Sequence, residues 1–359
     1  MPPKRTAHYG CRQIPWDSRT YNSKMMGSPV LVTGSTGALG PRVVSALLAA
    51  GRSVRTFSLA GTPTQLDGGD IDIRVGDITS AAQVRDAVHG VDSIIHLAAL
   101  LHFNNPAASM RSEYERINIG GTLNILRAAR EAGVRRVVFF STIAVYGPSS
   151  APEVILDEST AVRPETMYGE TKLEAERRVL DAVRPDGTLL GTVLRLGAVY
   201  GARIKGNYAR LVRSLARGRF VPVGSGSNRR TLVYDRDVAK AALLAMEHPL
   251  AAGRVYNVTD GGFHPLREVI SEICLALNRK PPRWALPIGP ARLSLALFDA
   301  AAKTAPWRLP SGCSMLDKYL EDVAVDGSRI QRELGFVPEY DLRRGWRETV
   351  SEMRTTGIM

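Results

Sequence analysis

A glycine-rich turn near the N-terminus constrains the fold of this chain more than any other feature. The apolar run from Pro29 to Thr33 stops at Gly34, and glycine recurs at Gly37 and Gly40, where a segment with helical spacing (38–50) begins. A buried strand, a tight turn and a helix in this order are typical of the first βαβ unit of a nucleotide-binding fold. Glycine permits close approach to the backbone, and a helix N-terminus attracts anions. The turn therefore predicts a site for the pyrophosphate of a dinucleotide.

Apolar runs alternate with helical spacing through the first 200 residues. Further strands are expected at 54–57, 71–75, 93–97, 134–140 and 189–196, and further helices at 80–89, 110–132 and 166–183. This alternation predicts an α/β fold, a Rossmann-type doubly wound parallel sheet with right-handed crossovers. We expect 28–200 to form the NAD(P)-binding domain, joined by a returning strand near 255–258. Residues 201–359 should mainly form a smaller C-terminal substrate-binding lobe.

Composition argues against several other classes of protein. The net charge is +12, but the basic residues are dispersed and do not interleave with aromatic residues, so no nucleic-acid partner is expected. An anionic substrate or membrane surface fits such a charge. No run of about 18 apolar residues exists, so we expect no transmembrane segment. The cysteines Cys11, Cys274 and Cys313 lie far apart, which argues against a disulfide framework or zinc site and fits a cytoplasmic protein.

The first 27 residues form a basic tail without the apolar core of a secretory signal. Met25 and Met26 immediately precede the first expected strand. We therefore expect this tail to be disordered, or to lie upstream of the true start.

A tyrosine and a lysine lie one helical turn apart in the segment Met167-Tyr168-Gly169-Glu170-Thr171-Lys172. Residues four apart share a helix face, so the Lys172 ammonium is expected to lie near the Tyr168 phenol and to lower its pKa. A tyrosine with a lowered pKa can act as a general base near neutral pH. Beside a nucleotide site, such a base predicts hydride transfer to or from a carbinol carbon. The spacing alone is common on solvated helix faces, and it gains weight from following the glycine turn.

Motifs in a fixed order resemble those of the extended short-chain dehydrogenase/reductase family, the NAD-dependent epimerase/dehydratase family that includes nucleotide-sugar epimerases and 3β-hydroxysteroid dehydrogenases. Besides the glycine turn, they are Gly76-Asp77-Ile78, His96-Leu97-Ala98-Ala99, Asn118 within 117–122, the segment 141–147 and the segment 194–201. The resemblance runs from about Pro29 to Val350. It implies a catalytic group of Thr142, Tyr168 and Lys172, in which Thr142 orients a substrate hydroxyl and Tyr168 removes its proton. Lys172 would also hold the nicotinamide ribose.

The same resemblance implies the cofactor contacts. The expected cofactor-binding residues are Gly34, Thr36, Gly37, Ala38, Leu39, Gly40, Ser58, Asp77, Ile78, Leu97, Ala98, Ala99, Asn118, Tyr168 and Lys172. The second strand normally ends on an acid that binds the ribose hydroxyls of NAD. Here Ser58 and then Leu59 stand at that position, and neither is acidic or basic. We expect NAD, with NADP as the open alternative. His96 is expected to be structural, and no cluster has metal-ligand spacing, so no metal is expected.

Two regions point to different substrates. Arg230 falls where nucleotide-sugar enzymes place an arginine on the diphosphate, and Asn207 is a second expected substrate contact. A guanidinium matches a phosphate through a bidentate fork. The usual aspartate after this arginine is Thr231 here. In contrast, the apolar stretch 284–309 resembles that of sterol dehydrogenases, and it would suit a sterol, a lipid-linked substrate or a membrane-surface face, or would simply be core.

These observations predict a homodimeric NAD(P)-dependent epimerase or oxidoreductase acting on a nucleotide sugar, similar to 4-epimerases. Thr142 is followed by Ile143 and Ala144 in place of the acid pair of sugar dehydratases, so dehydration is not expected. One alternative is a 3β-hydroxysteroid dehydrogenase. Another is a non-catalytic NAD(P)-binding regulator, against which the intact catalytic group argues. The sequence does not name the sugar, its nucleotide base or the direction of the reaction.

Overall fold

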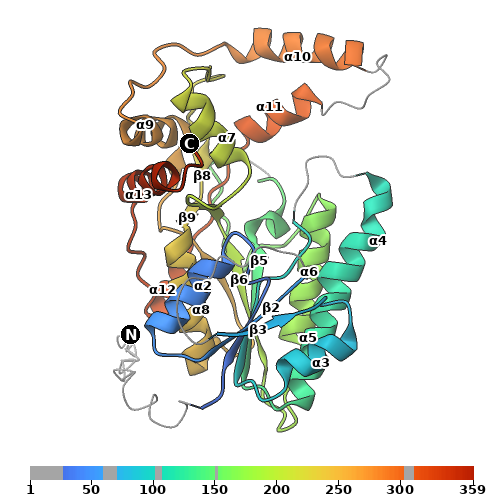
Figure 1. The fold of residues 1–359 in the computed structure, drawn as a ribbon. Coiled ribbons are helices and arrows are strands. Elements are labelled where there is room, and N and C mark those ends of the chain that lie inside the picture. The colour runs from blue at the N-terminus through green and yellow to red at the C-terminus, as the bar shows by residue number, and fades with distance from the viewer. Residues whose placement is uncertain (1–26, 60–70, 102–106, 150–152, 303–310) are drawn as a thin grey trace, which may run out of the picture.

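A seven-stranded parallel sheet forms the centre of the larger part of the molecule (Figure 1). The computed structural model describes residues 27–59, 71–101, 107–149, 153–302 and 311–359, so the expected basic tail falls almost wholly outside it. The strands are β1 (Val30–Thr33), β2 (Val54–Ser58), β3 (Ile71–Val75), β4 (Ser93–His96), β5 (Arg136–Thr142), β6 (Gly191–Leu196) and β10 (Val255–Val258). Their order, β10-β6-β5-β4-β1-β2-β3, reverses direction at β1. This order confirms the predicted Rossmann-type doubly wound fold.

Helices cover both faces of the sheet and give each face its own core (Figure 1). One face is covered by α2 (Gly40–Ala49), α8 (Asp235–Glu247) and α12 (Ser328–Leu334), and the other by α3 (Ala81–Val88), α5 (Thr122–Glu131) and α6 (Met167–Leu180). The central strands β1 and β4 are buried along their whole length, which explains why their sequences do not alternate between apolar and polar residues. Edge strand β3 instead exposes Ile73 and Val75.

The helix expected at 110–132 is interrupted in the structure. It consists of the 3₁₀ turn η2 (Ala108–Met110), α4 (Arg111–Tyr114), the π-helical segment η3 (Glu115–Gly121) and α5. The π-helical segment brings Gly121 against Ile78, and a Cβ on Gly121 would lie 2.5 Å from the Ile78 Cδ1 atom. Such segments are rare and are frequent at functional sites.

The C-terminal lobe stands above the sheet and has a separate core (Figure 1). Its helices are α7 (Asn207–Ala216), α9 (Leu266–Ala276), α10 (Ile288–Ala302), α11 (Gly312–Leu320) and α13 (Leu342–Thr355). Two small sheets pair β8 (Arg229–Arg230) with β11 (His264–Pro265), and β7 (Ala198–Tyr200) with β9 (Leu232–Tyr234). Trp346 stacks on Tyr200, with 4.5 Å between ring centroids, and this contact centres the lobe's core. None of the helices in the described part of the chain is both long and apolar enough to cross a membrane.

The chain returns from the lobe to the sheet twice. The first return is β10, which pairs in parallel with β6 and places Val255 opposite Val193. The second is α12, whose Ile330 is buried in the same core as the inner strands. The lobe is therefore tied to the sheet by several crossings of the chain.

Candidate active site

The expected site residues gather at the carboxyl edge of the sheet. Gly34 follows β1, Ser58 ends β2, Asp77 follows β3, Leu97 follows β4, and Thr142 ends β5. Because all seven strands are parallel, these ends meet at one edge, where open α/β folds bind ligands.

The first turn of the site requires glycine at two positions. Gly34 has a φ of +67°, and a Cβ there would lie 2.8 Å from the backbone of Ala98. A Cβ on Gly40 would lie 2.0 Å from the carbonyl oxygen of Ser35. Helix α2 begins at Gly40 without a side-chain cap or an acidic residue in its first turn. The turn and the positive end of the helix therefore fit a pyrophosphate.

The other residues of the turn lie between these two glycines. The Gly37 N–H donates to the Gly34 carbonyl at 3.0 Å, which closes the turn. Gly37 is exposed, Thr36 and Ala38 are half-buried, and Leu39 packs on the core beneath α2. The exposed middle of the turn is the part that a ligand can approach.

The ends of β2 and β3 are joined by hydrogen bonds. The Gly76 N–H donates to the Ser58 carbonyl at 2.8 Å, and the Asp77 carboxylate accepts from the Thr79 N–H at 2.8 Å. Ile78 is buried between α3 and the π-helical segment. Asp77 and Ile78 thus form a fixed turn beside Ser58, and the resemblance expects all three residues to contact the cofactor.

His96 is part of the framework below the turn after β4. It is fully buried, and burial lowers its pKa to about 3, so the ring is neutral. Its Nδ1 lies 2.6 Å from Thr33 Oγ1 and its Nε2 lies 3.1 Å from Thr122 Oγ1. Thr122 donates its own proton to the Asn118 carbonyl, so we assign the ring proton to Nε2 and Thr33 as the donor to Nδ1. Thr33 also accepts from the Ala98 N–H at 3.3 Å, which fixes the turn at 97–99.

Asn118 lies in the π-helical segment and links three parts of the site. Its side-chain oxygen accepts from the Leu100 N–H at 2.7 Å, and its NH₂ group donates to the Leu100 carbonyl and to Thr171 Oγ1, each at 3.2 Å. Both amide protons are thus used within the chain. Asn118 can therefore serve a cofactor by positioning the turn after β4 against α6.

The three expected catalytic residues lie where β5 meets α6. Tyr168 and Lys172 lie on the first two turns of α6, and Thr142 is the last residue of β5. The helix packs closely on the segment after Thr142, because a Cβ on Gly169 would lie 3.2 Å from the Ala144 carbonyl oxygen. Thr142 Oγ1 accepts from the Ala144 N–H at 3.2 Å, so its own proton can be donated to a ligand.

The acid–base properties of this pair differ from the sequence prediction. Burial raises the pKa of Tyr168 to about 12, with a further contribution from Tyr114. Burial lowers the pKa of Lys172 to about 7, against the opposing effect of Glu176, and Lys172 Nζ lies 3.8 Å from the centroid of the Phe139 ring. The expectation that Lys172 lowers the tyrosine pKa is wrong for this structure. Burial disfavours both charged forms, and this effect dominates.

A buried ion pair below Lys172 was not predicted. Glu176 lies one turn after Lys172, is 1% exposed, and pairs with Arg195 of β6 at 2.7 Å. Glu176 also accepts a hydrogen bond from Ser141, so α6 is tied to both β5 and β6. The guanidinium of Arg195 lies 4.9 Å from the Tyr146 ring centroid. The four-residue spacing from Lys172 to Glu176 was the only signal available in the sequence.

The expected substrate contacts lie in the lobe. Arg230, in β8, donates through Nη2 to the carbonyls of Lys318 and Tyr319 at 2.9 and 2.7 Å, near the end of α11. Asn207 is the first residue of α7 and is exposed. Burial raises the pKa of Tyr208 to about 12 while the nearby Arg230 charge opposes the shift, which places Arg230 beside the first turn of α7.

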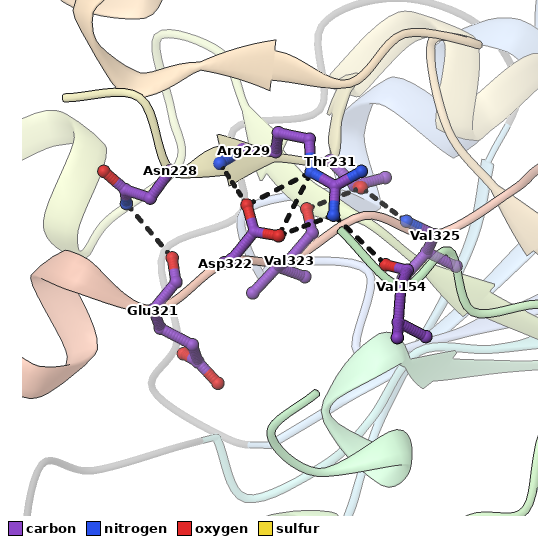
Figure 2. A network of polar contacts seen from close by, with 8 residues as sticks. All are labelled: Val154, Asn228, Arg229, Thr231, Glu321, Asp322, Val323 and Val325. Atoms are coloured by element: carbon purple, nitrogen blue, oxygen red, sulfur yellow. Dashed lines mark hydrogen bonds and ion pairs between the residues drawn. The ribbon is translucent and has the colours of Figure 1, made fainter. Parts of the chain in front are cut away.

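The residues on either side of Arg230 in the sequence, Arg229 and Thr231, have structural roles (Figure 2). Arg229 pairs with Asp322 at 2.6 Å. Thr231, at the position where the resemblance expects an aspartate, donates to the Val323 carbonyl at 3.1 Å and accepts from the Val325 N–H at 2.9 Å. Figure 2 shows that both side chains point toward the segment after α11, so they hold that segment against β8 and β9.

Comparison with known proteins gives the family of this chain. Residues 30–259 match the model of the NAD dependent epimerase/dehydratase family. The chain belongs to this family. The match confirms the resemblance seen in the motifs, and it confirms NAD as the cofactor of this family of enzymes.

Individual members of the NAD dependent epimerase/dehydratase family are similar along nearly the whole chain. A UDP-glucose 4-epimerase of Vibrio cholerae is 28% identical, over 91% of this chain and 95% of that protein. A 3-beta-hydroxysteroid dehydrogenase of Mycolicibacterium neoaurum is 27% identical, over 89% of each chain. The solved structure of MoeE5 in complex with UDP-glucose and NAD superimposes with a TM-score of 0.72 at 27% identity, over 91% of this chain and 99% of that one. Enzymes of both substrate classes expected from the sequence are thus among its relatives.

Proposed function

We propose that this protein is an NAD-dependent epimerase that acts on a nucleotide sugar. The observation that carries the proposal is the meeting of Thr142, Tyr168 and Lys172 at the sheet edge that also holds the glycine turn. The relatives support the substrate class, since one is a UDP-glucose 4-epimerase and MoeE5 is solved with UDP-glucose and NAD. NAD, when bound, supplies the hydride acceptor for oxidation of the sugar hydroxyl.

The acid–base steps belong to Tyr168. It would take the proton of the substrate hydroxyl when that carbon is oxidised, and return a proton when the keto sugar is reduced on its other face. With a pKa of about 12 the phenol is protonated at neutral pH, so a proton is present to be donated in the second step. The first step is favoured when Lys172 is charged, because a nearby ammonium stabilises a phenolate. Thr142 would hold the reacting oxygen by donating its hydroxyl proton.

Arg230 is the proposed contact for the substrate diphosphate. A guanidinium carries five N–H donors, and the bonds to Lys318 and Tyr319 employ Nη2 alone. These bonds hold the group at the end of α11 beside α7. The other nitrogens are proposed to bind phosphate, with Asn207 contributing from α7.

A substrate panel tests this proposal. The protein is incubated with NAD and a set of UDP-, GDP- and dTDP-sugars, and products are followed by chromatography while NADH is followed by absorbance. An epimerase converts at least one sugar into its 4-epimer without net NADH. No conversion of any sugar, with steady NADH formation from a 3β-hydroxysterol, would contradict the proposal.

A 3β-hydroxysteroid dehydrogenase is the second candidate. It is favoured by the similarity to the Mycolicibacterium neoaurum enzyme and by the exposed apolar residues around α10. A sterol has no diphosphate, so sterol oxidation should tolerate Arg230→Ala. Sugar conversion should not tolerate it, and this separates the two candidates.

A further inference from the structure

Helix α10 has an apolar side that no described part of the chain covers. Its other side rests on α11, where Leu295 lies 2.7 Å from a Cβ built on Gly312 and Asp299 accepts from the Gly312 N–H at 2.7 Å. On the opposite side Leu293 and Leu297 are each 64% exposed. Residues four apart share a helix face, so these two leucines form one apolar stripe. Figure 1 shows α10 at the end of the lobe farthest from the sheet.

More exposed apolar side chains lie on α10 and in the segment just before it. We define the α10 patch by its exposed members, Trp284, Leu286, Ile288, Leu293, Leu297 and Phe298. Exposed apolar residues elsewhere, such as Leu250 and Val337, stand apart from it in the chain. Exposed apolar residues gathered on one helix and its approach indicate an interaction site, whereas scattered apolar residues are normal.

Cations border the patch on the side where α10 begins. Arg279, Lys280 and Arg283 are exposed, and Arg279 and Lys280 line a cavity of about 330 Å³ together with Trp284. Over residues 279–302 the only acid is Asp299, which faces α11. The border of the patch is therefore positive, and the patch itself is apolar.

We propose that the α10 patch docks on an anionic lipid bilayer. Helices that lie in a membrane surface combine an apolar face with tryptophan and flanking lysine or arginine, and the cations add attraction to anionic headgroups. Trp284 and the cations would lie at headgroup level, and Leu293 and Leu297 would enter the acyl boundary. A second copy of the chain fits this surface less well, since its residues 279–302 would bring the same cations and one acid, Asp299, which is already bonded to α11. The docking does not depend on which substrate the active site takes.

Vesicle sedimentation tests the docking with the full chain. Wild type should bind vesicles of phosphatidylcholine mixed with phosphatidylglycerol, should bind phosphatidylcholine alone less well, and should be released by salt. The double variant Leu293→Ser/Leu297→Ser should lower the partition coefficient at least about tenfold, which corresponds to about 1.4 kcal/mol. Lys280→Glu/Arg283→Glu should abolish the preference for phosphatidylglycerol.

A matched control removes exposed apolar residues elsewhere. Leu250→Ser/Val337→Ser changes side chains that are 59% and 64% exposed, and it should bind vesicles like wild type. Circular dichroism and NAD titration check that each variant is folded. Equal binding by Leu293→Ser/Leu297→Ser and wild type, or no binding of wild type to anionic vesicles, would overturn the proposal. The proposal would also be overturned if wild type did not bind vesicles and the variant Leu293→Ser/Leu297→Ser changed oligomeric state, because the patch would then be a contact between copies of the chain.

Discussion

The expected cofactor side and the proposed substrate side of the site differ in how their polar groups are bonded. On the cofactor side His96, Asn118 and Glu176 are all buried, and each is bonded to other parts of the chain. On the substrate side Asn207 is exposed, and Arg230 is bonded only to backbone carbonyls of α11 in the contacts described above. The first arrangement builds a rigid frame for one invariant ligand. The second leaves Asn207 exposed and Arg230 half-buried, so the proposed substrate side can differ among enzymes that share the frame.

The largest expected effect is a loss of stability when the buried ion pair on the cofactor side is broken. Glu176→Gln removes the carboxylate from Arg195, whose side chain is 7% exposed, and leaves a buried charge without its partner. We expect a loss of about 3–5 kcal/mol in the free energy of unfolding, measured by urea denaturation without added NAD.

A second glutamate on the same helix gives the matched control. Glu174 pairs with Arg177 and Arg178, which are both exposed, so Glu174→Gln should cost less than about 1 kcal/mol. Equal losses in the two variants would show that the buried pair does not hold the frame.

The next largest effect is expected on turnover and not on stability. Tyr168→Phe removes the phenolic oxygen while the ring keeps its packing, so turnover should fall at least about 10²-fold. The melting temperature and the dissociation constant for NAD should stay close to those of wild type. Near-normal turnover in this variant would exclude Tyr168 as the acid–base residue.

A smaller effect is expected on the proposed substrate side, where a change at Arg230 should weaken nucleotide-sugar binding. A charge-assisted hydrogen bond contributes about 1.5–3 kcal/mol, so Arg230→Ala should weaken nucleotide-sugar affinity by roughly ten- to a hundredfold in calorimetric titration. Affinity for NAD should barely change.

The adjacent arginine is the control for this prediction. Arg229→Ala removes the pair with Asp322 shown in Figure 2, so it should lower stability more than it lowers sugar affinity. If Arg229→Ala and Arg230→Ala weaken sugar binding equally, the effect comes from the fold of the segment and not from a phosphate contact.

The last effect is a pH dependence of stability, which is small for each pH unit but accumulates over the window between two pKa values. Lys172 has a pKa of about 7 in the folded protein and 10.5 ordinarily, so between these values the unfolded chain binds a proton that the folded chain does not. The free energy of unfolding should therefore rise with pH across this window, by at most about 1.4 kcal/mol per pH unit. Lys172→Met should lack this rise, as measured by denaturation at several pH values without added NAD. Parallel curves for wild type and variant would mean that Lys172 titrates normally.

Short-range patterns account for what the sequence predicted correctly. Strand β3 begins and ends at the expected residues, Ile71 and Val75, because alternating residues bounded by polar turns define it locally. Gly34 and Gly40 were identified from the strand, turn and helix around them: Gly34 has a positive φ in the turn, and a Cβ on Gly40 would clash with Ser35, which lies in the same turn. These requirements are imposed by the turn itself, so they are visible in the sequence.

Contacts between distant segments account for what the sequence missed. The carbonyls that bind Arg230 lie 88 and 89 residues further along the chain. The residues around Asn118 have ordinary helical spacing in the sequence, whereas in the structure they form a π-helical segment that packs on Ile78. The sign of the Tyr168 pKa shift was wrong for the same reason. Spacing on a helix indicates a neighbour, but burial depends on the whole fold.

The returns of the chain at β10 and α12 bear on how the protein is made. A ribosome releases the chain from its N-terminus, and domains generally fold as units during synthesis. Here the sheet lacks its edge strand until Val258 has emerged, and its α2–α8 core lacks Ile330 and Phe336 until nearly the whole chain is complete. The sheet can thus be completed before most of the lobe is made, but its α2–α8 core cannot, because α7, α9, α10 and α11 are all synthesised before Ile330. Until then this face of the nascent nucleotide-binding domain has apolar surface uncovered.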